Sequence, residues 1–276
     1  MKNPQSVQKG NPHRLSRNQH IFPTRSINRF ARDGGVEVCE KIVGRIRRRP
    51  AKDVLFCAVR LWDHRSEQGF MLEIENAYQR LADKIVAGQR EMDEADHLSV
   101  TDYYCLWNLR QRARTKLQTF PQLAGYEPHR VITKKDTQEK LEKLGILYWD
   151  ENKEIPNHIL TGANLQMELL AERERMAGTR WGIFEATPDQ GEFLVSDRLS
   201  LHTAVPLSPQ ICLVAKHRNR FVDFSFVGRY NGLAVENSEN YYFGRDMKNC
   251  PVLLHATLRD ELTRAGLLNW DLKYRR

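Results

Sequence analysis

The chain has 276 residues, with 43 Lys and Arg against 35 Asp and Glu, which gives a formal net charge of +8. Hydrophobic residues make up 41% and charged residues 28% of the sequence, a mixture typical of a folded globular protein rather than a disordered or fibrous one. No apolar run approaches the roughly 18 residues that a membrane-spanning helix needs, and the N-terminal stretch lacks the apolar segment of a secretory signal. We therefore expect a cytoplasmic protein without a membrane partner.

The positive charge is concentrated near the N-terminus. Residues 1–52 contain 13 Lys and Arg but 3 Asp and Glu, whereas the rest of the chain carries 30 against 32. Clustered Lys and Arg release condensed counterions when they contact phosphates, so this segment favours a nucleic-acid partner, either RNA or DNA. Within it we expect Arg17, Arg45, Arg47 and Arg48 to contact phosphate. The alternative interpretation is an ordinary solvated basic surface.

The first elements in chain order are extended. Residues 1–19 are polar and basic, which predicts a flexible arm, and a single α+β domain is expected over residues 20–276. Short extended segments follow His20, and β-branched and aromatic residues accumulate in residues 54–62, which predicts a buried strand or packed turn.

Helical periodicity dominates residues 70–178. Apolar residues recur at spacings of three and four from Phe70 to Ile85, which predicts an amphipathic helix. Further helices are expected from Ser99 to before Pro121, over residues 137–144 before Gly145, and over residues 163–177 before Gly178.

The period changes to 2 in residues 180–245, which predicts an antiparallel sheet. The expected elements are a hairpin of residues 181–186 and 192–197, two strands at 210–217 and 221–227, a short edge strand at 241–244 and a last helix at about 252–265. The predicted fold class is therefore α+β, with an N-terminal extended segment, a helical middle and a C-terminal antiparallel sheet with a final helix.

Familiar catalytic signatures are absent from the sequence. It contains no GxxxxGK[ST], GxGxxG, HExxH or GxSxG pattern, and its five cysteines form no CxxC pair. His20 is a candidate general base or metal ligand because an unperturbed histidine titrates near neutral pH. The alternative is a histidine held in a turn by Pro23.

Three further polar groups are candidates for chemistry. Glu75 lies next to the apolar face of its predicted helix and is able to reach a partly buried site, although a solvated glutamate is the alternative. Arg110 and Arg114 are four residues apart on the next helix, a spacing that suits a phosphate clamp or a solvated basic edge. Asp197 ends a predicted strand, where a carboxylate serves either as a catalytic or metal-binding group or as a turn cap.

A family resemblance connects several of these positions. The pattern His20-x-x-Pro23-x-x-x-Ile27-x-x-Phe30 is followed by Ile74-Glu75, by Arg112 or Arg114, by Ser196-Asp197 and by Pro206-Leu207-Ser208-Pro209. In its order and spacing this sequence resembles the uncharacterised bacterial domain-of-unknown-function family 4238. Leu199 and Val195 depart from the proline and threonine that the family carries around Ser-Asp.

The resemblance implies candidate positions rather than a reaction. It adds Asn231 to the set of His20, Glu75, Arg112 or Arg114, and Asp197. If these residues meet in space, they would form a pocket able to attack a phosphodiester, with or without a divalent metal such as Mg²⁺ or Mn²⁺, while arginine holds the phosphate.

Three functions follow as hypotheses. The first is a nucleic-acid-directed bacterial effector, a nuclease-like toxin or phage-defence component in which His20, Glu75 and Asp197 are catalytic. The second is a non-catalytic assembly module that binds nucleic acid or an acidic protein partner. The third is an enzyme acting on a nucleotide, with Arg110 and Arg114 as anion clamps.

Overall fold

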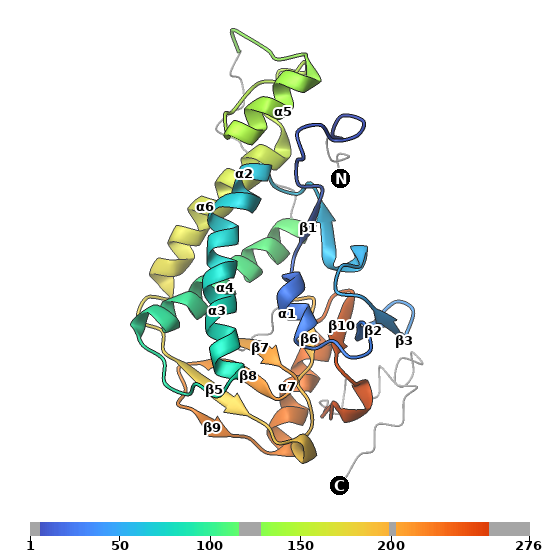
Figure 1. Cartoon of the computed structure of the whole chain (residues 1–276), viewed down its shortest axis with the longest axis vertical. Helices are drawn as coiled ribbons and strands as arrows, with labels where there is room; N and C mark the ends of the chain where they lie inside the picture. Colours follow the sequence, from blue (N-terminus) through green and yellow to red (C-terminus); the bar gives the residue numbers. More distant parts are fainter. Residues whose placement is uncertain (1–5, 116–127, 199–202, 254–276) are drawn as a thin grey trace. The chain divides into compact units, whose positions relative to one another are not determined.

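The computed structural model describes residues 6–115, 128–198 and 203–253, and Figure 1 shows the path of the chain. The fold is α+β with a helical middle and largely antiparallel sheets toward the C-terminus, which confirms the predicted class. The chain divides into two compact units. Unit 1 consists of Met1–Ile21, Val54–Ala77 and Cys105–Ala177, and unit 2 of Phe22–Asp53, Tyr78–Tyr104 and Gly178–Arg276. The sequence predicted one domain from residue 20 onward.

Unit 1 is mainly helical. Its elements are β1 (Asn18–His20), η1 (Val54–Phe56), β4 (Cys57–Val59), α2 (His64–Ser66), the π-helical turn η2 (Glu67–Met71), the first part of α3 (Leu72–Val86), the second part of α4 (Glu94–Thr115), α5 (Lys135–Leu144) and α6 (Asn157–Arg175). Strands β1 and β4 pair antiparallel, with Gln19 opposite Ala58. A buried strand or a packed turn was predicted over residues 54–62. Only β4 is a strand, and it is partly exposed; Val54–Phe56 form η1, and Arg60, at a φ of 46°, is outside the strand conformation.

The helices predicted within residues 70–178 are confirmed, with some shifted boundaries. The end of the second of them, predicted before Pro121, lies outside the described residues. Helix α5 is terminated by Gly145 at φ 71°, the left-handed conformation that ends helices at glycine. Helix α6 ends at Arg175, and Gly178 at φ 70° lies in the turn that follows. Helix α4 begins at Glu94 rather than Ser99, because the Asp93 carboxylate accepts a hydrogen bond of 2.8 Å from the Asp96 backbone N–H.

The N-terminal segment from residue 6 onward packs within unit 1. Gln8 donates from its backbone N–H and its side-chain amide to the Glu139 carboxylate of α5, over 2.6 and 3.0 Å. Leu15 is 3% exposed, and His13 Nε2 lies 2.7 Å from Asp136 Oδ1. For residues 6–19 these contacts differ from the flexible arm expected over residues 1–19; residues 1–5 lie outside the described part of the chain. Composition alone did not indicate that the polar side chains have specific partners on α5.

Unit 2 contains two four-stranded sheets and several helices. Its elements are α1 (Thr24–Asn28), β2 (Val36–Glu40), β3 (Arg45–Arg49), the remainder of α3 and α4, β5 (Trp181–Glu185), η4 (Pro188–Gln190), β6 (Val195–Ser196), β7 (Ala204–Ser208), β8 (Ile211–Ala215), β9 (Arg220–Phe221), α7 (Phe224–Asn237), β10 (Tyr241–Gly244) and η5 (Met247–Asn249). The strand orders are β3-β2-β10-β6 and β7-β8-β5-β9.

Two pairing predictions in unit 2 are wrong. Residues 192–197 do not form a hairpin with β5, because β5 pairs with β8 and β9 while β6 pairs with β10. Strand β10 is not an edge strand, since it lies between β2 and β6. Both errors have one cause: a strand's own residues specify its buried faces but not which distant strand it joins.

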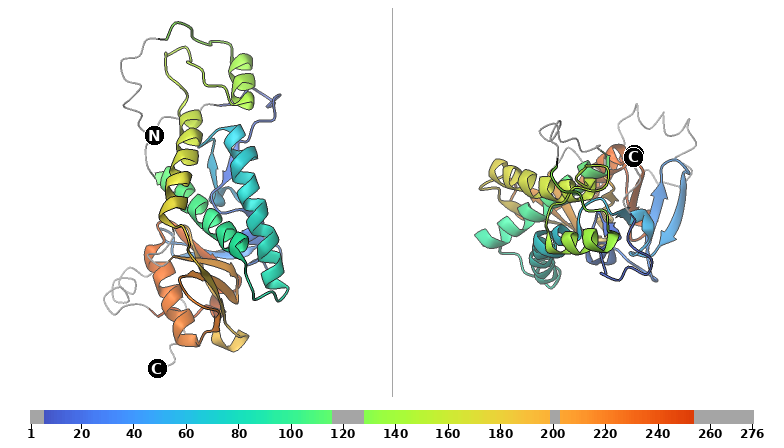
Figure 2. Two further views of the ribbon diagram at one scale, coloured as in Figure 1. Left: turned by 90° about the vertical axis from the view of Figure 1, so that its left-hand side faces the viewer. Right: turned by 90° about the horizontal axis from the view of Figure 1, so that it is seen from above.

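The strand predicted over residues 221–227 is also wrong. Only Arg220 and Phe221 are extended, and α7 begins at Phe224. The Asp223 carboxylate caps this helix by accepting a hydrogen bond of 2.7 Å from the Phe226 N–H. Val227 and Tyr230 of α7 pack against Phe184 and Cys212 of the second sheet, and Figure 2 shows the helix against that sheet.

Two observations bear on the remaining predictions. The last expected helix, at about residues 252–265, lies almost wholly outside the described residues. Among the helices in the described ranges, none has the length and apolar character needed to cross a membrane.

Candidate functional site

The predicted residues His20 and Glu75 both belong to unit 1. His20 lies on β1, half-buried, with its Nε2 atom 3.6 Å from the Cys57 sulfur. Glu75 lies on α3 and accepts a short hydrogen bond from Arg110 Nη1. The Arg110 guanidinium also lies 3.7 Å from the Glu67 carboxylate and 5.1 Å from the centroid of the Trp62 ring.

Arg110 is engaged by protein groups and is 1% exposed. Burial raises the pKa of Glu67, and the positive charge of Arg110 opposes that rise. This environment differs from the predicted phosphate clamp, because a clamp has to meet solvent. On the same helix Arg112 pairs with Glu168 and Glu172 at 3.2 and 3.1 Å, and Arg114 is partly exposed.

Asp197 and Asn231 belong to unit 2 and have local structural partners. The Asp197 carboxylate accepts hydrogen bonds from the backbone N–H groups of Glu239 and Asn240, over 2.7 and 2.8 Å, and from the Asn240 side chain. Asn231 is fully buried; it accepts from the Leu194 N–H and donates to two backbone carbonyls, each over 2.8 Å. The geometry of Asp197 is that of the turn cap that the sequence offered as the alternative. The three predicted catalytic residues are divided between the units, with His20 and Glu75 in unit 1 and Asp197 in unit 2.

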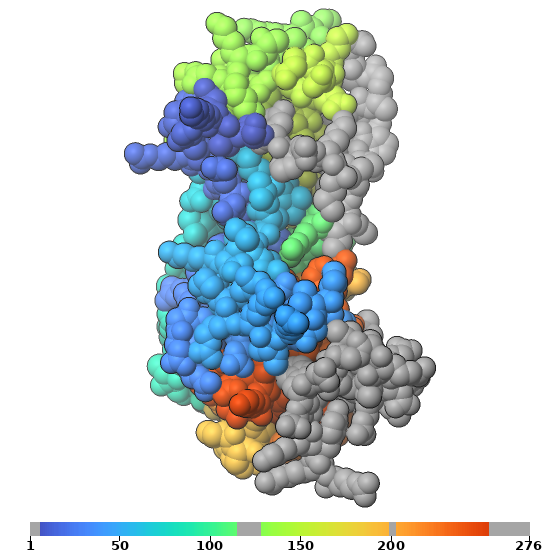
Figure 3. Space-filling view, turned by 90° about the vertical axis from the view of Figure 1, so that its right-hand side faces the viewer, coloured from blue at the N-terminus to red at the C-terminus, as the bar shows by residue number. Residues whose placement is uncertain are grey.

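Strand β3 carries the densest run of positive charge. It forms one edge of its sheet with the sequence Arg45-Ile46-Arg47-Arg48-Arg49, and all of its residues except Arg49 are exposed. Figure 3 shows the segment that contains β2 and β3, coloured blue, at the surface. The other predicted phosphate contact, Arg17, is exposed in unit 1.

The arginines of β3 fall into two classes. Arg48 pairs with Asp33 and Glu37 at 2.9 and 3.0 Å, and Arg49 pairs with Glu40 at 2.8 Å and Asp53 at 3.4 Å.

Arg45 and Arg47 differ from them, since neither forms an ion pair with any residue in the described ranges. Alternate residues of a strand point to the same side, so Arg45 and Arg47 share one face with a rise of about 6.8 Å between them. They are the cationic side chains of β3 that remain available to a ligand.

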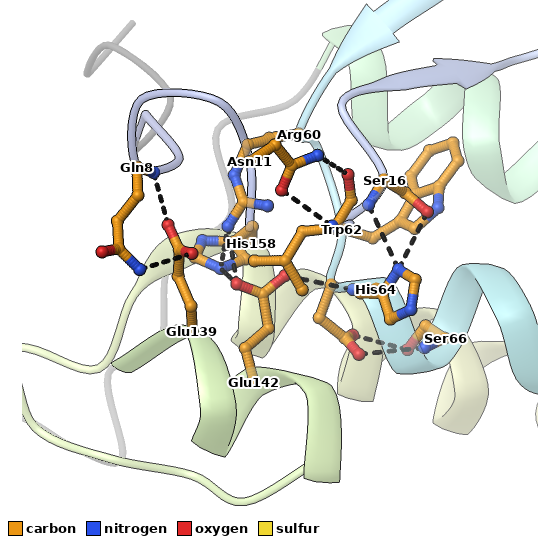
Figure 4. Close-up of polar contacts among 12 residues, drawn as sticks. Gln8, Asn11, Ser16, Arg60, Trp62, His64, Ser66, Glu139, Glu142 and His158 are labelled. Atoms are coloured by element: carbon orange, nitrogen blue, oxygen red, sulfur yellow. Dashed lines mark hydrogen bonds and ion pairs between the residues drawn. The ribbon is translucent and has the colours of Figure 1, made fainter. Parts of the chain in front are cut away.

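A second polar site, in unit 1, was not predicted. Arg60 Nη2 lies 2.6 Å from Glu142 Oε2 and 3.0 Å from His158 Nε2, while His158 lies 3.1 Å from the same oxygen (Figure 4). All three side chains are at most 3% exposed. Burial alone would raise the pKa of Glu142, but the hydrogen bonds and charges of His158 and Arg60 lower it to about 2. The carboxylate is therefore ionised at neutral pH.

The neighbouring His64 is held in its neutral form. Its Nδ1 atom accepts a hydrogen bond of 3.1 Å from the Ser16 N–H, and its own backbone N–H donates to Glu142 Oε1 over 3.2 Å. Burial lowers the pKa of His64. Both oxygens of Glu142 thus have hydrogen-bond donors, so the cluster connects the loop at residues 60–64 with α5 and α6.

A pocket of about 340 Å³ opens beside this cluster within unit 1. Asp63, Ser66 and Glu142 line it together with apolar residues that include Phe70 and Ile159. Ser66 donates to Asp63 from its backbone and its hydroxyl, over 2.9 and 2.6 Å, so the Asp63 carboxylate caps α2. The volume is at the lower end for small-molecule sites, and the polar groups of its wall mainly bond to one another.

No sequence signal marked this cluster, because Arg60, Glu142 and His158 come from three separate segments and form no motif.

No protein-family model, curated protein or solved structure matches this chain, and the resemblance to family 4238 stays a prediction. Within the described ranges no group of three or more His, Cys, Asp or Glu side chains is arranged to hold a metal ion. The use of Mg²⁺ or Mn²⁺ also stays a prediction.

Proposed function

We propose that this chain binds nucleic acid through β3, as a binding module rather than a nuclease. The observation that carries the proposal is the pair Arg45 and Arg47, exposed on one face of an edge strand and joined to no carboxylate in the described part of the chain. An arginine outside any ion pair binds a phosphate without first breaking a bond to a carboxylate, and its binding releases counterions from the nucleic acid.

The geometry of the carboxylates favours binding over cleavage. Glu75 neutralises the buried Arg110, and Asp197 caps the turn at residues 239–240. A general base has to be within hydrogen-bond reach of the proton that it removes, and both carboxylates are instead directed at groups of the protein itself.

The binding test compares two double variants of equal charge. Arg45→Gln/Arg47→Gln removes the available charges of β3, and Arg80→Gln/Arg229→Gln removes two exposed charges elsewhere in unit 2. Fluorescence anisotropy with labelled RNA and DNA, single-stranded and duplex, should give a Kd about tenfold higher for the first variant. The control should remain within about twofold of the wild type. Equal weakening of the two variants, or no binding by the wild type, would overturn the proposal.

The same mixtures test for cleavage. Each is incubated with Mg²⁺ or Mn²⁺ and separated on a denaturing gel, beside His20→Ala and Asp197→Ala. The proposal predicts intact oligonucleotide throughout. Products that form with the wild type and disappear with either variant would show that the protein is a nuclease and would overturn the binding-module assignment.

A further inference from the structure

The loop of residues 216–221, which follows β8 and includes the short strand β9, presents an exposed aromatic side chain among basic ones. Its sequence is Lys216-His217-Arg218-Asn219-Arg220-Phe221, and all six residues are exposed. Phe221 is 75% exposed, on a strand that pairs parallel to β5. Among the exposed large hydrophobic side chains in the described ranges, Phe221 is the one aromatic ring, and it stands among basic residues.

The backbone of this loop is held directly against β5. A Cβ atom added at Gly182 would lie 2.7 Å from the carbonyl oxygens of both His217 and Arg218, so glycine permits the close approach. The side-chain amide of Asn219 holds the loop through two hydrogen bonds. Its oxygen accepts from the Ile183 N–H over 2.8 Å, and its nitrogen donates to the Arg90 carbonyl over 2.6 Å.

Arg220 and Phe221 project to opposite sides of β9. The Arg220 guanidinium lies 4.3 Å from the Phe184 ring centroid and 5.2 Å from that of Phe226, and so covers the core of the second sheet. Phe221 is in register with Glu185, whose charge is paired with Arg90 at 2.5 Å. The backbone of Phe221 is therefore held beside a neutralised ion pair, while its side chain is exposed.

The charge of the loop complements phosphate. Lys216, Arg218 and Arg220 contribute three positive charges, the loop has no Asp or Glu, and within the described ranges none of these three side chains forms an ion pair. An aromatic ring flanked by cations is the arrangement with which proteins bind single-stranded nucleic acid, since unpaired bases stack on the ring while the backbone follows the charges. A duplex does not offer an unstacked base.

We infer that Phe221 is a stacking platform for an unpaired base, with Lys216 and Arg218 contacting the adjacent phosphates, and that the preferred ligand is single-stranded RNA or DNA. This inference rests on the proposed nucleic-acid binding and specifies its substrate class. It depends on residues distinct from Arg45 and Arg47, so the two claims are tested by different variants.

The experiment measures Kd for labelled single-stranded RNA, single-stranded DNA and duplex DNA of equal length. It compares the wild type with Phe221→Ala, Phe221→Trp and Arg45→Gln/Arg47→Gln. Phe221→Ala should weaken single-strand binding about tenfold, leave duplex binding within about twofold and leave the salt dependence unchanged, because no charge is lost. Phe221→Trp should restore tight single-strand binding. The two single-stranded arms show whether RNA or DNA is preferred.

Different failures have different meanings. If the wild type binds no oligonucleotide, the proposed function and this inference both fall. If it binds, responds to Arg45→Gln/Arg47→Gln and ignores Phe221→Ala, the stacking inference alone is overturned. A monomer–dimer shift on Phe221→Ala in sedimentation, without a change in Kd, would likewise overturn it and assign Phe221 to contact with a second copy.

Discussion

Arg60 and Glu142 form an ion pair of 2.6 Å in which both side chains are almost completely excluded from solvent. Arg60 comes from a loop with a positive φ and Glu142 from α5, so the pair joins two segments separated by 82 positions. His158 of α6 completes the cluster. Because charge in a protein interior is costly unless it is compensated, the three residues depend on one another.

Removing the charge of Glu142 should therefore destabilise the protein strongly. Glu142→Gln removes the charged carboxylate that lies 2.6 Å from the buried Arg60, and we expect a loss of about 3–5 kcal/mol in the free energy of unfolding. Urea denaturation followed by circular dichroism measures it. The matched control is Glu168→Gln, which alters an ion pair with Arg112 that is 41% exposed on both sides and should cost less than about 1 kcal/mol. Equal losses would contradict the account.

The same carboxylate predicts a pH dependence. The Glu142 pKa falls from an ordinary value of 4.5 to about 2 in the folded protein, so the unfolded state takes up this proton first as the pH decreases. The stability that Glu142 contributes is complete above about pH 4.5 and is lost as the pH falls toward 2. Asp136, whose pKa is lowered to about 2 by Lys140 and His13, titrates in the same window.

The contribution of Glu142 is isolated by difference. The free energies of unfolding of the wild type and Glu142→Gln are measured from pH 6 to pH 3. Both proteins contain Asp136, so its titration cancels in the difference between them. That difference should decrease toward acid pH, because only the wild type loses the stability contributed by an ionised Glu142. A gap that stays constant with pH would contradict an ionised Glu142.

Helix α6 approaches α2 so closely at Gly162 that a larger residue does not fit. An added Cβ would lie 1.7 Å from Asp63 Oδ2 and 2.5 Å from the Ser66 hydroxyl. Gly162→Ala should lower the unfolding free energy by about 1–3 kcal/mol, although alanine is the better helix former. The neighbouring exposed change Ala163→Ser serves as the control in thermal melts. An increase in Tm for Gly162→Ala would contradict the packing described.

Asp197 should behave as a structural residue. Asp197→Ala removes three hydrogen bonds to residues 239–240 and should cost about 1–2 kcal/mol of stability. Glu239→Ala is the control, because Glu239 contributes its backbone N–H and not its side chain to this turn. Nucleic-acid affinity should be unchanged in both variants below their melting temperatures. A variant of wild-type stability that loses affinity would place Asp197 at the ligand instead.

Local sequence signals predicted the helical middle well, because helix ends depend on nearby residues such as Gly145. They failed where alternation was misleading. The stretch Phe221–Val227 has the pattern of a strand, yet the cap at Asp223 and the spacing of Val227 and Tyr230 make it the start of α7. Alternation and capping are competing signals, and only the packing against the second sheet decides between them.

The candidate nucleic-acid site on β3 was only partly predictable from the sequence. The basic composition of residues 45–49 identified a charged segment, but it did not distinguish Arg45 and Arg47 from Arg48 and Arg49. That distinction depends on carboxylates that folding brings to the strand, such as Glu37 opposite Arg48. The Arg60–Glu142–His158 cluster lay beyond prediction because its contacts are long-range.

The most direct test of nucleic-acid binding through β3 is the salt dependence of Kd. For a single-stranded oligonucleotide, the plot of log Kd against log salt concentration is compared between the wild type and Arg45→Gln/Arg47→Gln. Each lost phosphate contact should reduce the slope by about 0.7, so the double variant should be shallower by about 1.4. Arg80→Gln/Arg229→Gln should keep the wild-type slope. Identical slopes for all three proteins would contradict the claim that Arg45 and Arg47 contact phosphate.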